Sequence, residues 1–231
     1  MLALAVLGWI AMVIWEMRAA EPVIDFRLLA NRNFAIASVF FFVFGVGLFG
    51  TTTLIPQVLQ SLYGYRAIDA GDYRHYALAR AFQGLGYGFM FVSLNLIAYS
   101  HLRPEQNNRA SSLTNFFRNW GGSFGIALVT TVAERRQQFH QTNVGATATA
   151  SSQQFAERTH ALAGYLVSKG FTGPDAALAA QGSVLQQLQH QVSLLAFMDC
   201  FRILAWVTLA TLPLLFAVRH FKPAGKPPAA H

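Results

Sequence analysis

Five long apolar segments alternate with polar segments along this chain of 231 residues. They occupy residues 1–16, 34–62, 81–102, 113–133 and 194–218. A helix needs about 20 apolar residues to cross the hydrocarbon core of a bilayer, and every segment except the first reaches that length. In lipid the backbone of a span must satisfy its own hydrogen bonds, and these runs are too long and continuous for barrel strands. The pattern therefore predicts an all-α membrane protein with about five transmembrane helices.

The first apolar segment leaves two alternatives open. Its apolar run ends at Trp15. At 1.5 Å per residue this run would rise only about 22 Å, which is less than the hydrocarbon core of about 30 Å. A secretory signal peptide begins with basic residues ahead of its apolar run, and no Lys or Arg precedes this one. We therefore favour a partial transmembrane span at residues 1–16 over a signal peptide.

Polar segments connect the predicted spans at residues 17–33, 63–80, 103–112 and 134–193, and a tail follows at residues 219–231. The longest connection, at 134–193, is rich in Gln, Ala, Ser and Thr. Within it, residues 142–152 are typical of a loop. Thr172, Pro174 and Asp175 then form a helix-start pattern, after which Leu and Val recur at helical spacing. We expect this helix to lie on the membrane surface or against a neighbouring span.

The low share of charged residues, 12%, supports a membrane protein, because a soluble domain carries about 25%. The net charge of +7 comes mostly from Lys and Arg beside the apolar segments, where such residues anchor helix ends and attract anionic lipid. They form no clustered basic patch, which argues against nucleic acid as a partner. A slight excess of basic residues around 17–33, 103–112 and 219–231 predicts that these segments are cytoplasmic. Residues 63–80 and 134–193 are then extracytoplasmic.

Residues suited to catalysis or metal binding are sparse. The single cysteine, Cys200, cannot form an internal disulfide, and no spacing of Cys and His indicates a metal site. No nucleophile lies near a candidate base, and no two carboxylates are paired. The sequence therefore predicts neither an enzyme nor a cofactor.

Residues 115–125 are the most informative apolar stretch. Asn115, Arg118, Gly122 and Gly125 follow steps of three and four, so a helix places them on one face. A cation at the centre of a bilayer costs at least about 2.5 kcal/mol, so it is expected to face protein or a water-filled cavity. Two interpretations of Arg118 stay open: a functional charge on a packed face, or a side chain that extends to the nearby cytoplasmic interface.

Polar residues in the other predicted spans are further candidates for a transport path. Gln60 and Asn95 are amides in apolar helices, where such groups either bond across helices or line a pathway. Asp199 lies three residues before Arg202, so the two can pair on one helix surface, and we favour a structural role for this pair. Small residues that let helices approach closely complete the set of candidate sites: Gly84, Gly88, Gly121, Gly122 and Gly125.

Several motifs, in order along the chain, resemble the EmrB/QacA-type drug:proton antiporters, which are fourteen-span members of the major facilitator superfamily. Residues 21–34 (EPVIDFRLLANRNF) resemble the cytoplasmic start of the ninth span, and residues 54–65 (LIPQVLQSLYGY) resemble its end. Residues 83–95 resemble the twelfth span and residues 110–125 the thirteenth. Residues 135–140 and 197–202 resemble stretches before the long last extracytoplasmic loop and within the final span.

The resemblance implies a proton-driven multidrug efflux transporter of the bacterial inner membrane. Protons and hydrophobic drugs would be its cargo, and a periplasmic membrane-fusion adaptor protein is a candidate partner. Two departures are expected as well. The chain begins within the eighth span of the family, and the tenth and eleventh spans are absent at a junction near Gly71 and Asp72. We therefore expect a fragment that does not transport without the missing transporter half.

An alternative class of function stays open beside the transporter fragment. The chain would then be a non-transporting membrane interaction or scaffold protein, packed against a full transporter or an adaptor through its glycine-containing helix faces.

Overall fold

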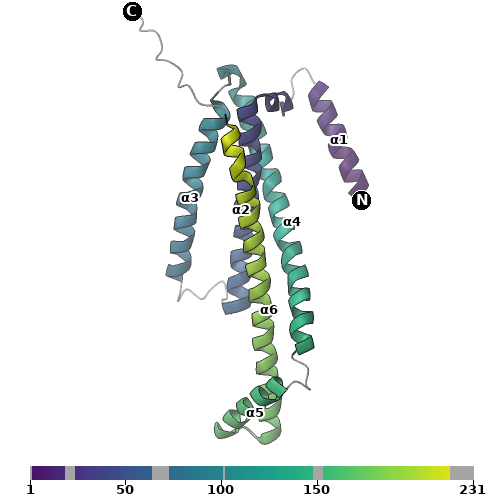
Figure 1. Cartoon of the computed structure of the whole chain (residues 1–231), viewed down its shortest axis with the longest axis vertical. Coiled ribbons are helices and arrows are strands. Elements are labelled where there is room, and N and C mark those ends of the chain that lie inside the picture. Colours follow the sequence, from purple (N-terminus) through teal and green to yellow (C-terminus); the bar gives the residue numbers. More distant parts are fainter. Residues whose placement is uncertain (1, 19–23, 64–72, 101, 148–152, 219–231) are drawn as a thin grey trace, which may run out of the picture. The chain divides into compact units, whose positions relative to one another are not determined.

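The computed structural model describes residues 2–18, 24–63, 73–100, 102–147 and 153–218. All regular structure among these residues is helical (Figure 1). The α-helices are α1 (Leu2–Arg18), α2 (Arg32–Tyr63), α3 (Tyr73–Tyr99), α4 (Asn107–Thr147), α5 (Gln153–Ser168) and α6 (Gly173–Thr211). Short 3-10 helices lie at Phe26–Ala30 (η1), Pro104–Gln106 (η3) and Leu212–Ala217 (η4). The predicted all-α fold class is confirmed.

The chain forms two units. Unit 1 comprises Met1–Gly50, Ala70–Ile126 and Leu204–His231, and unit 2 comprises Thr51–Asp69 and Ala127–Ile203. Helices α2, α4 and α6 contribute residues to both units, whereas α1 and α3 belong to unit 1 and α5 to unit 2. Each unit has its own set of buried side chains.

Aromatic side chains of α2 form the centre of unit 1. The rings of Phe41 and Phe91 meet edge to face with centroids 6.0 Å apart, and Phe44 meets Tyr87 in the same way at 5.3 Å. The cluster around them combines residues of η1, α2, α3 and α4, among them Leu28, Phe34, Phe40, Leu94, Ala98, Ala110 and Leu113. The core of unit 1 therefore joins α2 to both α3 and α4.

Glycines bring the backbones of α2 and α4 together within unit 1. A Cβ atom placed on Gly45 would lie closer than 3.0 Å to the carbonyl oxygen of Arg118. A Cβ on Gly121 or Gly125 would meet the carbonyl oxygens of Phe42 and Val46 equally closely. Since real Cβ atoms do not approach backbone atoms this closely, the crossing requires glycine on both helices.

Asp25 fixes the connection that precedes α2. Its carboxylate accepts a hydrogen bond from the backbone N–H of Arg27 at 3.2 Å, which caps the start of η1. The same carboxylate lies 3.4 Å from Nη1 of Arg109 at the start of α4, and it is only 9% exposed. The connection is therefore held against the start of α4 by a mostly buried charge.

A tight turn joins α5 to α6 in unit 2. Gly170 has a φ of +98°, a left-handed conformation that glycine adopts without strain. The backbone N–H of Gly170 donates to Val167 and that of Phe171 donates to Leu166, which is the Schellman pattern of a helix end. The hydroxyl of Thr172 then bonds to the carboxylate of Asp175 in the first turn of α6. The helix start predicted at these residues is confirmed.

The loop predicted at residues 142–152 is wrong in its first part. Residues 142–147 were predicted as part of a loop, but they continue α4 to Thr147, because a formed helix extends at low cost and no Pro interrupts it. Helix α3 begins at Tyr73, so its first turns lie within the predicted connection at residues 63–80, and its apolar part begins at Arg80. Apolar content marks where a helix enters lipid and not where its hydrogen-bonded ladder starts. The rest of both predicted segments, 148–152 and 64–72, lies outside the described residues.

Three helices of the described chain are long and apolar enough to cross a membrane: Arg32–Ser61, Arg80–Tyr99 and Gly173–Ala217. The last of these includes η4, where the chain changes from α to 3-10 geometry at Pro213, which lacks the N–H that an α-helix uses. Helix α1 has only 17 residues, and α4 carries Arg118 within its apolar part. The first and fourth of the five predicted spans therefore remain predictions.

Candidate functional site

The carboxylate of Asp199 is the meeting point of three basic side chains in unit 2. Its Oδ2 lies 3.0 Å from Nε2 of His140 and 3.6 Å from Nε of Arg136, both on α4. Its Oδ1 lies 3.4 Å from Nη1 of Arg202, one turn further along α6. The predicted pairing of Asp199 with Arg202 is therefore present, and two residues of α4 join it.

Burial differs within this cluster, which we call the Asp199 cluster (Arg136, His140, Asp199 and Arg202). The side chains of Asp199 and His140 are 18% and 19% exposed, whereas Arg202 is 68% exposed. Beside them, the buried thiol of Cys200 donates to the backbone carbonyl of Val129 over 3.7 Å. The contact between Asp199 and His140 thus lies at the sheltered end of the cluster, where α4 and α6 are held together.

The Asp199 cluster contains one acidic group and up to three positive charges. Its basic members come from α4 and α6, so the carboxylate of Asp199 joins these two helices within unit 2.

Arg118 lies in unit 1, half-buried on α4. Its guanidinium carbon is 5.9 Å from the centre of the Phe91 ring of α3, a distance at which a cation is attracted to an aromatic face. Asn115, one turn earlier, is exposed, and the described residues contain no hydrogen bond between Asn115 and Arg118. The structure thus places Arg118 against α3 while its own backbone oxygen faces α2 at Gly45.

The other transport-path candidates belong to different units. Asn95 belongs to unit 1, where its amide donates to the backbone oxygen of Phe91 at 2.7 Å within the same helix. Gln60 belongs to unit 2 and is exposed near the end of α2. Phe91 is therefore the common neighbour of Asn95 and Arg118, whereas Gln60 and Asp199 are located in the other unit.

The five candidate packing glycines fall into two groups. Gly121, Gly122 and Gly125 are buried against α2, where a Cβ on Gly122 would meet the ring of Phe49 at 2.5 Å. Gly84 and Gly88 of α3 have no atom of another described element within 4 Å of an added Cβ. The role of this second pair as a packing surface stays a prediction that concerns a partner outside the described chain.

Sequence reasoning did not identify His140 and Arg136 as partners of Asp199. His140 and Asp199 lie 59 residues apart in the sequence, so no local spacing relates them. The pair formed by Asp25 and Arg109 was missed for the same reason, because its members lie 84 residues apart. The sequence does contain one sign of this cluster: Arg136 and His140 are four residues apart, so they lie one turn apart on the same face of a helix.

Among the described residues no group of three or more His, Cys, Asp or Glu side chains is arranged to hold a metal ion. Comparison with known proteins adds independent information. No protein-family model matches the chain, and no solved structure matches it.

Curated relatives do match. The chain is 26% identical to the multidrug export protein EmrB of Escherichia coli, over 98% of this chain and 53% of that protein. It is 27% identical to the probable multidrug resistance protein EmrY of Escherichia coli, over 62% of this chain and 38% of that protein. It is 23% identical to the fatty acid resistance protein FarB of Neisseria gonorrhoeae, over 76% and 44%. The chain thus spans about half the length of the first of these relatives, and less of the others.

These relatives and the apolar helices agree with each other and with the resemblance seen in the sequence motifs. The similarity to EmrB extends over nearly the whole chain, and the helices suited to crossing a bilayer fall in the regions that resemble membrane spans of the family. This chain is similar to the EmrB-type multidrug export proteins over nearly its whole length, and its described part is all-α with three helices long and apolar enough to cross a membrane.

Proposed function

We propose that this chain forms part of a proton-driven multidrug efflux system and that it does not transport drugs by itself. The observation that carries this proposal is the alignment with EmrB, which covers almost all of the chain and yet extends over about 54 more positions than this chain has residues to fill. Protons and hydrophobic drugs are the proposed cargo of the complete system. The lipid bilayer, a second transporter half and a membrane-fusion adaptor protein are its proposed partners.

The size of the internal gap follows from the alignments. The alignment with EmrB extends over 280 positions, but 98% of 231 residues is only about 226 residues, so about 54 positions have no residue in this chain. The same comparison gives about 52 such positions with EmrY, where 62% of the chain aligns over 195 positions. With FarB it gives about 50, from 76% of the chain over 226 positions.

A gap of this size equals two membrane spans of about 20 residues with their loops. This supports the expected loss of two spans at the junction near Gly71 and Asp72, which lies outside the described residues. Transporters of this kind work by moving two groups of helices around a central site. A chain without two of those helices is unable to close such a site on both sides, which is the physical reason for the proposed lack of transport.

Reconstitution tests this proposal. Vesicles that contain only this chain and enclose a fluorescent hydrophobic dye are expected to show no dye movement when a proton gradient is applied. Vesicles with Escherichia coli EmrB prepared in the same way serve as the positive control. Proton-driven dye movement in the vesicles that hold this chain alone would rule the proposal out.

A second candidate function has one observation in its favour. Helix α3 exposes large apolar side chains in unit 1, with Phe82 71% and Phe89 77% exposed, and its glycines meet no described neighbour. A membrane interaction or scaffold protein that packs α3 against a full transporter would use such a face. Co-purification of this chain with a complete EmrB-type transporter, lost when Gly84 and Gly88 are both replaced by Leu, would favour this alternative.

A further inference from the structure

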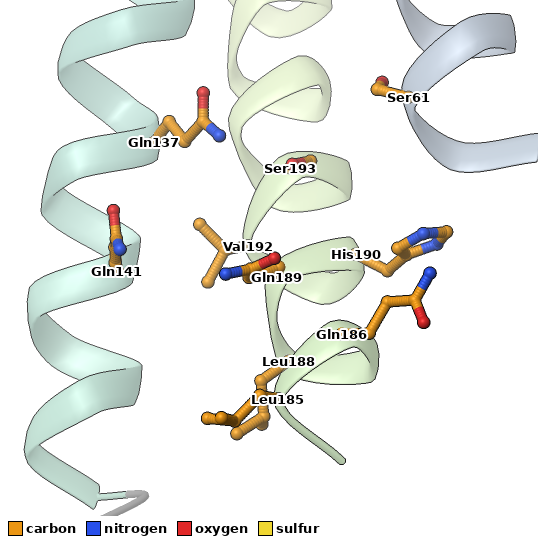
Figure 2. Close-up of a pocket in the computed structure, with 10 residues that line it drawn as sticks. All are labelled: Ser61, Gln137, Gln141, Leu185, Gln186, Leu188, Gln189, His190, Val192 and Ser193. Atoms are coloured by element: carbon orange, nitrogen blue, oxygen red, sulfur yellow. The ribbon is translucent and has the colours of Figure 1, made fainter. Parts of the chain in front are cut away.

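Helix α6 borders a polar groove of about 550 Å³ in unit 2 (Figure 2). Gln137 and Gln141 come from α4, and Ser61 comes from the end of α2. Figure 2 shows Gln189 directed from α6 toward the side of α4, and His190 directed toward the side on which Ser61 lies. Volumes of this size are typical of sites for small molecules, which measure about 300–1,000 Å³.

The polar lining of this groove consists mainly of amides. Four glutamines take part: Gln137, Gln141, Gln186 and Gln189. Within the described part of the chain, none of these four side chains forms a hydrogen bond. Each glutamine amide offers both donors and an acceptor, so it matches hydroxyl groups, which also donate and accept. All four glutamines are exposed, so their amides are accessible from solvent and present a set of hydrogen-bonding groups to a ligand.

The remaining lining limits the charge of that ligand. Leu185, Leu188 and Val192 provide an apolar wall. The ten lining residues include no Asp, Glu, Lys or Arg. A charged ligand would lose water in this groove without gaining a fully charged partner, which is unfavourable. The lining thus fits a neutral molecule that combines an apolar group with several hydroxyls.

We propose that this groove binds neutral, polyhydroxylated amphiphiles, of which aryl glycosides are the simplest soluble examples. The apolar group of the ligand would rest against Leu188 and Val192, and its hydroxyls would bond to the glutamine amides. This site goes beyond the proposed transport function, because its lining includes none of the transport-path candidates.

Binding to the full chain in lipid nanodiscs tests this inference, with phenyl β-D-glucoside as the probe and calorimetry as the measurement. Saturable binding is expected, and the anionic analogue phenyl β-D-glucuronide should bind at least about tenfold more weakly. The double variant Gln137→Leu, Gln189→Leu removes two amides that would bond the ligand, and it should bind the glucoside at least about tenfold more weakly.

Matched controls keep this test decisive. Gln181→Leu makes the same change at an exposed position of α6 outside the groove, and binding should stay unchanged. Gln189→Glu keeps the size of the side chain, and it should weaken glucuronide binding further because two negative charges would then meet. Absence of saturable glucoside binding, equal affinity for the glucuronide, or equal loss in the Gln181→Leu variant would each overturn the inference.

Discussion

Asp199 combines the features that make a polar residue of a membrane protein noteworthy. It is mostly sheltered, it lies in a helix suited to crossing a bilayer, and it faces basic groups from two helices. A carboxylate in such a place is unfavourable unless positive partners surround it. The Asp199 cluster supplies those partners, so Asp199 holds α4 and α6 together within unit 2.

Replacing Asp199 by Asn should destabilise the protein, because the cations of Arg136 and Arg202 would then repel each other without a counter-charge. The expected loss is about 1–3 kcal/mol, the usual cost of removing one partner from a sheltered polar contact. Thermal unfolding of the purified protein in detergent, followed by circular dichroism, measures this loss. Arg202→Gln is the control and should cost less than about 1 kcal/mol, because its partner contact is exposed. An equal effect of both variants would contradict the central place of Asp199.

Arg118 lends itself to a test in a complete relative. We propose that its contact with Phe91 keeps a charge on the interior side of the helix, where it lines the transport path or orients polar groups. Replacing the matching Arg of EmrB by Leu should impair efflux while membrane insertion is kept, because Leu inserts more easily than Arg. Lys should restore efflux only in part, since it lacks the planar array of donors. Normal efflux by the Leu variant would leave Arg118 as an interfacial anchor.

The sequence identified most polar residues that the structure makes noteworthy, but not their partners. Asp199 and Arg202 were predicted as a pair because helical spacing relates them. His140 was not identified as a partner of Asp199, because nothing local connects it to a carboxylate 59 residues away. Side-chain contacts between distant segments depend on how the helices pack, and the spacing of residues along one helix does not contain that information.

At the scale of the element, the crossing of α2 and α4 is the tightest feature of unit 1. Gly121→Ala places a methyl group against the backbone of Phe42, which is unable to move aside as a flexible side chain does. We expect a loss of stability of about 1–3 kcal/mol, the usual cost of overpacking. Gly84→Ala is the matched control, since its added methyl group meets open space. It should be neutral or stabilising by up to about 1 kcal/mol through helix propensity.

Unfolding temperatures of both variants check this prediction. A Gly121→Ala protein as stable as the Gly84→Ala protein would show that α2 and α4 do not approach as closely as described. The glycines of residues 121–125 were recognisable from their spacing, but Gly45 was not, because one glycine in an apolar helix gives no sign of its partner.

Helix boundaries show where the sequence pattern stops being informative. The start of α6 was predictable because Thr172, Pro174 and Asp175 carry local capping chemistry. The continuation of α4 through residues 142–147 was not, since Thr and Asn have weak helix preferences. A helix that is already formed continues at low cost, because each further residue adds a hydrogen bond to an existing turn.

At the scale of the whole molecule, the number of missing spans determines orientation. Loss of two spans leaves every later span in the direction that it has in the relatives, whereas loss of one or three would invert them. The proposed gap of about 54 positions relative to EmrB fits two spans and not one or three. This agrees with the excess of basic residues that predicts a cytoplasmic location for residues 17–33 and 219–231.

Cysteine labelling in intact cells tests this architecture most directly. In a Cys200→Ser background, which removes the single native cysteine, the variants Thr147→Cys and Lys226→Cys are treated with a membrane-impermeant maleimide. We predict strong labelling at position 147 and labelling at position 226 only after the cells are permeabilised. Labelling of position 226 but not of position 147 in intact cells would contradict the proposed loss of an even number of spans.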